Sequence, residues 1–238
     1  MIHVSVILPT FNERGNIVRL VEKIKTELVK SYPFEVLIVD DNSTDGTAVA
    51  CKTAFKNNQN IKIFERRNEK GLATAIYYGI QRAKGKFIVV MDTDFNHDPS
   101  IIPVMLKKIK KNTMVIGSRY ISGGGMANRK RYWLSKFYNS YLHILLQIPL
   151  TDFVSGFFCI ERDKLMELIK NNHREIFAGY GDYFMMLIML FYKSGGLFLE
   201  IPVYYKDRDY GISKSNFIAM FLEYTQTSLK IFSKYRLK

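Results

Sequence analysis

The sequence predicts an α/β protein in which helices cover both faces of a mostly parallel central sheet. Apolar runs of strand length alternate with segments of helical period from the first residues to Lys111. The connections are short, and polar side chains follow the ends of the apolar runs. This alternation is typical of a doubly wound sheet, which binds its ligands beyond the carboxyl ends of its strands. With 238 residues, the chain has room for one large domain.

The expected elements follow in order along the chain. Strands are expected at residues 3–10, 35–40, 61–65 and 87–91, and helices at residues 16–31, 45–56, 72–83 and 100–111. After them we expect a strand at 114–120, a glycine-rich loop at 122–125, a helix at 132–147, a strand-like segment at 151–162, helices at 163–171 and 183–193 and a strand at 198–205. A polar loop would then join a domain at 1–215 to a C-terminal amphipathic helix at 216–238.

The composition and the missing motifs exclude several classes of protein. Apolar residues make up 47% of the chain and charged residues 24%, which is the balance of a folded globular protein. Cys51 and Cys159 lie far apart and outside any CxxC pair, which argues against structural zinc and fits a reducing compartment. No GxGxxG follows the first strand and no GxxxxGK[ST] occurs, so neither a dinucleotide site nor a P-loop is expected. GxSxG, HExxH and nucleic-acid-binding signatures are also missing.

Positive charge is concentrated in the second half of the chain. Residues 1–98 carry 14 Lys and Arg against 12 Asp and Glu, whereas residues 99–238 carry 21 against 10. No acidic side chain occurs between Pro99 and Thr151, although Arg119 and the basic cluster 129–131 lie there. A solvated helix face accounts for the lysines at 107–111. The arginines around the glycine-rich loop instead predict binding of a large anion or an anionic surface.

The segment FIVVMDTD is the most informative one. Asp92 and Asp94 follow an apolar run, and alternate residues of a strand point to the same face about 6–7 Å apart. Two such carboxylates suit a hard cation, Mg²⁺ or Mn²⁺, that also binds diphosphate oxygens. A DxD triplet alone has a second interpretation, because it also suits a cap for the helix that follows. The ends of two earlier strands, PTFNE and DDNS, add further polar groups, so we expect one acid-rich edge.

Seven short motifs are spread over nearly the whole chain. They are VILPTFNE at 6–13, IVDDNSTDGT at 38–47, GLATA at 71–75, MDTDFNHDP at 91–99, GSRY at 117–120, SGFF at 155–158 and DRDYGISKS at 207–215. In this order the motifs resemble glycosyltransferase family 2, which has the Rossmann-like GT-A fold, and within it the dolichyl-phosphate mannose synthase group. The resemblance implies transfer of a sugar from a nucleotide sugar to a polyprenyl phosphate.

The resemblance also implies roles for single residues. The donor nucleotide sugar would be bound by Pro9, Thr10, Glu13, Asp40, Asp41 and Asp92, with Arg208 and Lys214 closing over its phosphates. The metal would be held by Asp92, Asp94 and Asn96, which stands where the family often has Gln. The acceptor phosphate would be bound by Arg119, Arg131 and Ser135. The catalytic residues would be Asp92, Asp94, Arg119 and Asp152, and Asp182 would stand near the place of a late acidic residue of the family.

The expected reaction is inverting, metal-dependent transfer of a hexose to dolichyl or polyprenyl phosphate, with GDP-mannose as the leading donor. A phosphate monoester has a second pKa of about 6, so it reaches the enzyme as a charged nucleophile and needs no general base. Three alternatives stay open. The donor could be a UDP sugar such as UDP-glucose, or the acceptor a saccharide hydroxyl, which would need a base at Asp152 or Asp182. The third is a basic nucleic-acid-binding module, although we expect no nucleic acid partner.

A polyprenyl acceptor requires contact with a membrane surface. The chain opens on a strand rather than a signal peptide, and no apolar stretch reaches the 18 or so residues of a transmembrane helix. We therefore expect a peripheral protein on the cytoplasmic side of a membrane, with a membrane-protein partner as a further option. Two apolar stripes are candidates for docking or for core packing, at Trp133, Phe137, Tyr141, Ile144 and Leu145 and at Ile218, Leu222, Leu229 and Phe232.

Overall fold

Seven strands form the central sheet of the computed structural model, which describes residues 2–179, 181–206 and 217–235. The strand order is β3 (Ile61–Glu65), β2 (Phe34–Asp40), β1 (Val4–Thr10), β4 (Phe87–Val90), β7 (Phe158–Glu161), β5 (Thr113–Ser118) and β8 (Leu197–Pro202). Among these described strands only β7 runs antiparallel to its neighbours. The carboxyl ends of the other six strands therefore meet at one edge, and the predicted mostly parallel sheet is confirmed.

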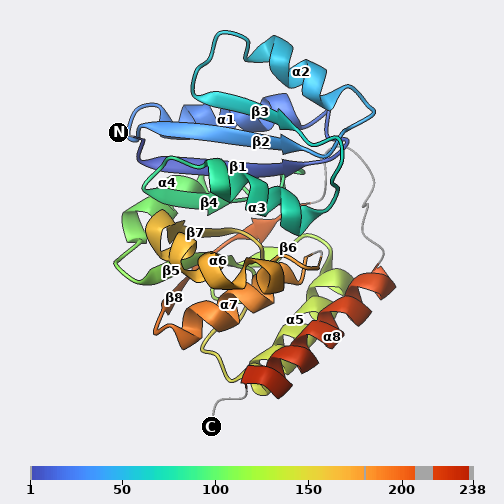
Figure 1. Ribbon diagram of the computed structural model, residues 1–238. Coiled ribbons are helices and arrows are strands. Elements are labelled where there is room, and N and C mark those ends of the chain that lie inside the picture. The colour runs from blue at the N-terminus through green and yellow to red at the C-terminus, as the bar shows by residue number, and fades with distance from the viewer. Residues whose placement is uncertain (1, 180, 207–216, 236–238) are drawn as a thin grey trace.

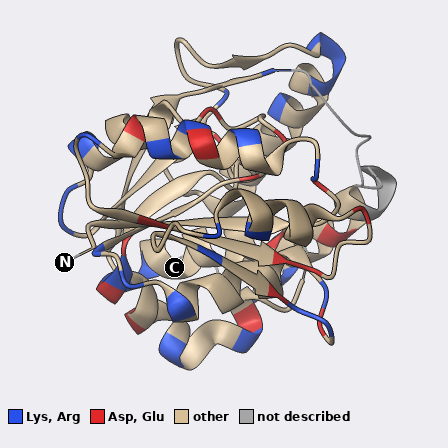
Figure 2. Cartoon of the chain, turned by 90° about the horizontal axis from the view of Figure 1, so that it is seen from above, with Lys and Arg blue, Asp and Glu red and all other residues tan. Residues whose placement is uncertain are grey.

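Helices cover both faces of this sheet (Figure 1). One face is covered by α1 (Ile17–Leu28), α2 (Thr47–Ala54) and α4 (Ile101–Lys108), and the other by α3 (Leu72–Arg82), α6 (Arg162–Ile176) and α7 (Tyr183–Lys193). Because side chains alternate along a strand, β1 sends Ile7 into one core and Val6 and Leu8 into the other. The sheet is thus apolar on both faces, and polar side chains gather at its ends; Figure 2 shows acidic residues at the arrowheads of strands.

Two long helices lie side by side beyond this sheet, α5 (Arg129–Leu146) and α8 (Phe217–Tyr235) (Figure 1). The rings of Tyr138 and Phe221 are 5.3 Å apart between them. Leu142 of α5 and Ile231 of α8 are fully buried in the core that α7 also lines. The predicted C-terminal helix is therefore present, and it packs on the rest of the chain. The domain boundary at residue 215 stays a prediction.

Several element ends differ from the prediction for identifiable reasons. α5 begins at Arg129 rather than at residue 132, because the side-chain oxygen of Asn128 accepts a hydrogen bond from the Arg131 amide (3.0 Å) and caps the helix. α4 ends at Lys108, since the next residue is extended. The segment 151–157 is a loop, so only β7 remains of the expected strand.

The strand expected at 198–205 is divided in two. It forms β8 and then β9 (Tyr204–Tyr205), which pairs in parallel with β6 (Gly125–Met126) from the expected glycine-rich loop. Between the two strands, the amide of Val203 donates to the carbonyl of Ser118 (3.0 Å). This small second sheet brings Tyr205 to the carboxyl end of β5, next to the site described below.

Candidate active site

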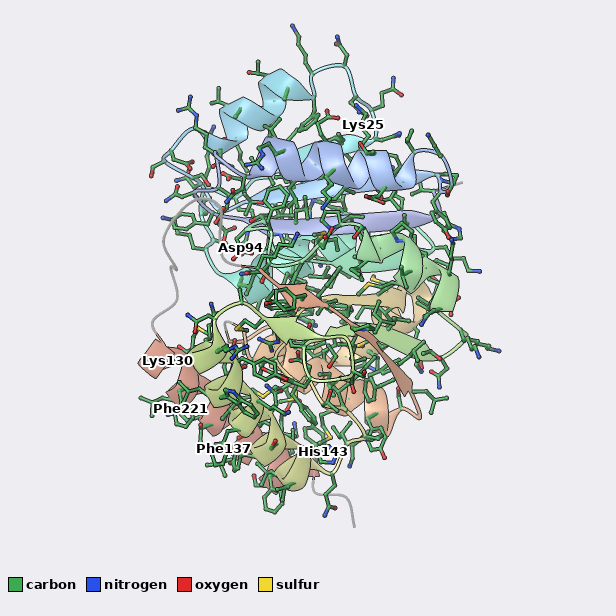
Figure 3. All side chains as sticks on the ribbon, turned by 180° about the vertical axis from the view of Figure 1, so that it is seen from behind. Lys25, Asp94, Lys130, Phe137, His143 and Phe221 are labelled. Carbon is green, nitrogen blue, oxygen red and sulfur yellow. The ribbon has the colours of Figure 1, made fainter. Side chains whose placement is uncertain are left out.

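A cavity of about 300 Å³ opens at the carboxyl ends of β1, β4 and β5. This is the position at which the strand order reverses around β1, where doubly wound sheets bind ligands. The acidic wall of the cavity is made of Glu13, Asp41, Asp92 and Asp94. Three basic residues also line the cavity, Lys70, Arg119 and Arg131. Lys70 precedes Gly71, and we call Arg119 and Arg131 the cationic wall. Figure 3 labels Asp94 at the sheet edge with the start of α5, marked by Lys130, below it.

The structure gathers most of the residues predicted for the site and leaves a few outside the cavity. Those that line it are Pro9, Thr10, Glu13, Asp41, Asp92, Asp94, Asn96, Arg119 and Arg131. Asp40, Asp152 and Ser135 do not line the cavity. The predicted donor-side residues Arg208 and Lys214 lie outside the described residues.

The loop after β4 presents Asp94 to the cavity. Asp94 is buried except for its cavity side, and Asn96 donates to both of its carboxylate oxygens, from its backbone amide to Oδ1 (3.1 Å) and from Nδ2 to Oδ2 (2.8 Å). Between the two residues, Phe95 has a φ of 64°, which is unusual for a bulky side chain and turns the chain back on Asp94. The carboxylate is therefore held by its own loop, whereas that of Asp92 is about half exposed.

The donor set of this loop fits a hard divalent cation. Asp92 and Asp94 supply carboxylate oxygens to the same cavity, as Mg²⁺ or Mn²⁺ requires. In the described part of the chain, no three His, Cys, Asp or Glu side chains form a metal site by themselves. Such a cation would complete its coordination with water and phosphate oxygens, as Mg²⁺ does in nucleotide sites. Asn96 uses its Nδ2 on Asp94, and its direct coordination of the metal stays a prediction.

Asp41 is held in place from β3 and α3. Its Oδ1 accepts a hydrogen bond from Nε of Arg66 (2.6 Å), and its Oδ2 accepts one from the Gly71 amide (2.8 Å). Gly71 has a φ of 136°, a conformation that side chains rarely adopt, so glycine is required there. Arg66 is buried directly after β3 and also bonds the carbonyl of Gly71 (3.0 Å). Sequence reasoning missed Arg66, although its position directly after the strand at 61–65 was an available signal.

Asp40 shapes the turn after β2 instead of facing the cavity. Its Oδ2 accepts a hydrogen bond from the Ser43 amide (2.9 Å), and its Oδ1 accepts one from the Ser43 hydroxyl (2.5 Å). Burial raises the pKa of Asp40, although the bonds from Ser43 act in the opposite direction. The side chain therefore stabilises the turn that presents its neighbour Asp41.

The cationic wall is centred on a buried ion pair. Arg119 donates from Nε to Oδ2 of Asp152 (2.8 Å) and from Nη2 to Oδ1 (2.6 Å), and its backbone amide also donates to Oδ2 (3.1 Å). Burial alone would lower the pKa of Arg119, but Asp152 raises it above its ordinary value, so the guanidinium stays charged. Within the described chain, Nη1 has no hydrogen-bond partner. Asp152 is fully buried, whereas Arg119 lines the cavity.

The first turn of α5 completes this wall. Arg131 is exposed and lines the cavity. Ser135, one turn later, hydrogen-bonds the hydroxyl of Tyr120 and so ties α5 to the residue after Arg119. Asp182, at the start of α7, accepts a hydrogen bond from the Thr227 hydroxyl (2.6 Å) and lines a separate cavity between α6, α7 and α8.

His97 follows Asp94 by three residues and belongs to the same loop. It is fully buried beneath the loop after β4 and does not line the cavity. Burial lowers the pKa of its imidazole, which favours the neutral form. Its ring stacks on Phe157 at 4.7 Å and contacts Tyr205, which does line the cavity.

Comparison with known proteins agrees with this geometry. The family model for glycosyl transferase family 2 matches residues 5–169. A dolichol-phosphate mannosyltransferase from Pyrococcus furiosus is 34% identical over 67% of this chain, and one from Saccharomyces cerevisiae is 32% identical over 69%. A polyprenol monophosphomannose synthase from Mycolicibacterium smegmatis is 29% identical over 88%. The matches span 46%, 62% and 79% of these three relatives, so the chain matches only about half of the Pyrococcus furiosus protein.

Solved structures show the same fold. Glucosyl-3-phosphoglycerate synthase from Mycobacterium tuberculosis, crystallised with Mn²⁺ and UDP, superposes with a TM-score of 0.74 at 16% identity, over 98% of this chain and 80% of that one. The same enzyme with Mg²⁺ and UDP gives a TM-score of 0.71 at 17% identity, with the same coverage of both chains. These similarities confirm the predicted GT-A-like fold. Because the family model covers more than half of its residues, the chain belongs to glycosyl transferase family 2.

Proposed function

We propose that this protein transfers a hexose from a nucleotide sugar, GDP-mannose, to dolichyl or another polyprenyl phosphate. One observation carries the proposal, which is that a single cavity has an acidic wall facing a cationic wall. Asp92 and Asp94 suit the metal-bound diphosphate of a donor, and Arg119 and Arg131 suit the phosphate of an acceptor. The names of the three relatives support this choice of substrates.

The proposed step is a single displacement at the anomeric carbon of the sugar. A phosphate oxygen of the acceptor forms the new bond to this carbon, and the bond from the carbon to the donor diphosphate breaks with its electron pair on the leaving oxygen. Because entry and departure occur on opposite sides, the configuration inverts. Arg119 and Arg131 hold the attacking phosphate in place, and Asp152 keeps the guanidinium of Arg119 in position. A divalent cation, when bound, would neutralise charge on the departing diphosphate.

The positions of the two candidate bases, Asp152 and Asp182, favour a phosphate acceptor over a saccharide hydroxyl. A hydroxyl needs a base within about 2.6–3.2 Å of its proton or one water away. Asp152 is enclosed by its three hydrogen bonds with Arg119, and Asp182 lies on the other cavity. A phosphate monoester is already largely dianionic at neutral pH and needs no such group.

The proposed acceptor also needs a membrane surface, and α5 and α8 offer one. Large apolar side chains are exposed along both helices, and we name this set the α5–α8 face: Trp133 (63% exposed), Leu134 (60%), Phe137 (80%), Ile144 (75%), Phe221 (48%), Leu222 (56%) and Leu229 (51%). Figure 3 shows Phe137 and Phe221 on this part of the molecule. Arg129 and Lys130 are exposed at the start of α5, next to the cavity. No described helix has the length and apolar character to cross a bilayer.

We propose that the α5–α8 face lies on the cytoplasmic side of a membrane, with the apolar side chains at the lipid boundary. Basic residues beside apolar and aromatic ones suit anionic lipid. This placement would bring the mouth of the cavity and Arg131 close to the phosphate of a lipid acceptor. A membrane-protein partner that covers part of this face is compatible with the same arrangement.

A donor panel tests the proposed function directly. The purified protein is incubated with Mg²⁺ or Mn²⁺, a short polyprenyl phosphate and each of several GDP and UDP sugars, and the lipid-linked product is measured. We expect mannosyl lipid from GDP-mannose, and loss of the product when EDTA removes the metal. If product forms only from UDP-glucose, the proposed donor changes to a UDP sugar and the proposed acceptor stays the same. Absence of any lipid product, with transfer to a saccharide or with salt-sensitive RNA binding in its place, would overturn the proposal.

A further inference from the structure

A buried chain of hydrogen bonds joins the two walls of the cavity. Nδ1 of His97 accepts a hydrogen bond from the backbone amide of Asp92 (2.8 Å). Because Nδ1 accepts, the neutral ring carries its proton on Nε2, which lies 2.7 Å from the hydroxyl oxygen of Tyr205. His97 therefore donates its Nε2 proton to the hydroxyl oxygen of Tyr205.

The other end of this series of hydrogen bonds reaches the cationic wall. The hydroxyl of Tyr205 donates to the carbonyl oxygen of Ser155 (3.1 Å), a residue that lines the cavity. The ring of Tyr205 lies under the guanidinium of Arg119, with 4.8 Å between the ring centroid and Cζ. Stacking of Phe157 on the imidazole holds the ring plane of His97. His97 follows β4 and Tyr205 ends β9, so the contact joins segments more than a hundred residues apart in the sequence.

We infer that His97 and Tyr205 are positioning residues that fix the loop of Asp92 and Asp94 relative to Arg119. The inference rests on the proposed function, because it assigns the two walls to donor and acceptor. Neither residue needs to touch a substrate through its hydrogen-bonding atoms for this role. Partners of metal-binding side chains commonly contribute about 10–100-fold in affinity or rate, which sets the size of the expected effects.

Two substitutions of His97 by an amide side chain each break the chain of hydrogen bonds at a different end. In His97→Asn, the side-chain oxygen stands near the place of Nδ1, so the bond from the Asp92 amide is kept and the bond to Tyr205 is lost. In His97→Gln, the longer side chain reaches toward Tyr205 but leaves the Asp92 amide without its acceptor. Tyr205→Phe removes only the hydroxyl and keeps the ring under Arg119. Tyr204→Phe is the matched control, because Tyr204 is the exposed neighbour on the same strand.

Three measurements test the inference. Hydrogen exchange of the Asp92 amide should become roughly 10-fold faster or more in His97→Gln and change little in His97→Asn. Mn²⁺ affinity, measured by electron paramagnetic resonance, should fall about 10-fold in His97→Gln only. Turnover should fall in both. Tyr205→Phe should cost less in the His97→Asn background than in the wild type, because the bond between the two side chains is already broken and only the bond from Tyr205 to Ser155 is left to lose. Tyr204→Phe should match the wild type in all three.

Equal amide exchange in the two His97 variants, or simple addition of the turnover losses of His97→Asn and Tyr205→Phe, would overturn the inference. A parallel loss of thermal stability and of every activity in both variants would show that the pair only supports the fold. The exchange measurement needs neither metal nor substrate. It therefore tests the positioning role of His97 and Tyr205 even if the wild-type protein makes no lipid-linked sugar. That second outcome would contradict the proposed function alone.

Discussion

Asp94 on the acidic wall and Arg119 on the cationic wall are held in different ways. On the acidic wall, Asp94 is held by Asn96, two residues later in the same loop. On the cationic wall, Arg119 is held by Asp152, 33 residues away and fully buried. The difference teaches that the carboxylate of Asp94 is oriented by a contact within one loop, whereas the guanidinium of Arg119 is oriented by a residue from a distant segment.

The largest expected effect is on turnover, at the acidic wall. In Asp94→Ala, the rate of lipid-linked product formation should fall by roughly 10²–10³-fold, the size typical of losing one electrostatic contact to a developing charge. The unfolding free energy should change little, because the bonds that Asn96 donates to Asp94 lie within one short loop at the edge of the sheet. The matched control is Asp163→Ala, an exposed carboxylate paired with Arg162. Full turnover in Asp94→Ala would refute the metal assignment.

The second effect sharpens the comparison, because loss of the ion pair in the cationic wall should lower the unfolding free energy of the protein. Asp152→Ala leaves the charge of Arg119 buried without its partner, which should cost about 3–5 kcal/mol in unfolding free energy, measured by urea denaturation. The double variant Arg119→Met with Asp152→Leu removes both charges and should recover most of that stability while staying inactive. If Asp152→Ala and Asp94→Ala destabilise the protein equally, the contrast between the two walls does not hold.

A third effect concerns the surface beside the cationic wall. Burying a large apolar side chain is worth about 1.5–3 kcal/mol, so Phe137→Ser should weaken binding to anionic vesicles by roughly 10-fold or more. Turnover with a short, water-soluble acceptor should be unchanged, because Phe137 does not line the cavity. Cosedimentation with vesicles gives the affinity. Val49→Ser, at an exposed site on α2, serves as the control, and an equal loss in that variant would count against docking through the α5–α8 face.

The smallest effect returns to the acidic side and depends on pH. Burial raises the pKa of Asp40 in the folded state, so folding is favoured by its protonated form. This contribution is present at low pH and is lost as the pH rises through the folded-state pKa. Asp40→Asn should therefore gain stability relative to the wild type as the pH rises from about 4, by less than about 1 kcal/mol. Urea unfolding at several pH values measures the difference, and a gap that shrinks with rising pH would contradict it.

Much of the site follows from short stretches of sequence. The alternation of apolar runs and helical segments predicts parallel strands, and parallel strands bring their carboxyl ends to one edge. The motifs after β1, β2 and β4 therefore already place Glu13, Asp41, Asp92 and Asp94 together, and the structure brings all four to one cavity. The charge imbalance of the second half likewise predicts a cationic counterpart, which Arg119 and Arg131 supply.

Other features were decided only by the tertiary structure. The sequence by itself determined the sheet and the acidic edge, because apolar period, strand ends and the DxD spacing act within a few residues of the chain. The pairing of Arg119 with Asp152, the insertion of antiparallel β7 and the contact of His97 with Tyr205 join segments that no local pattern connects. Their partners are selected when the strands and helices pack and each buried charge or ring nitrogen must find a hydrogen bond.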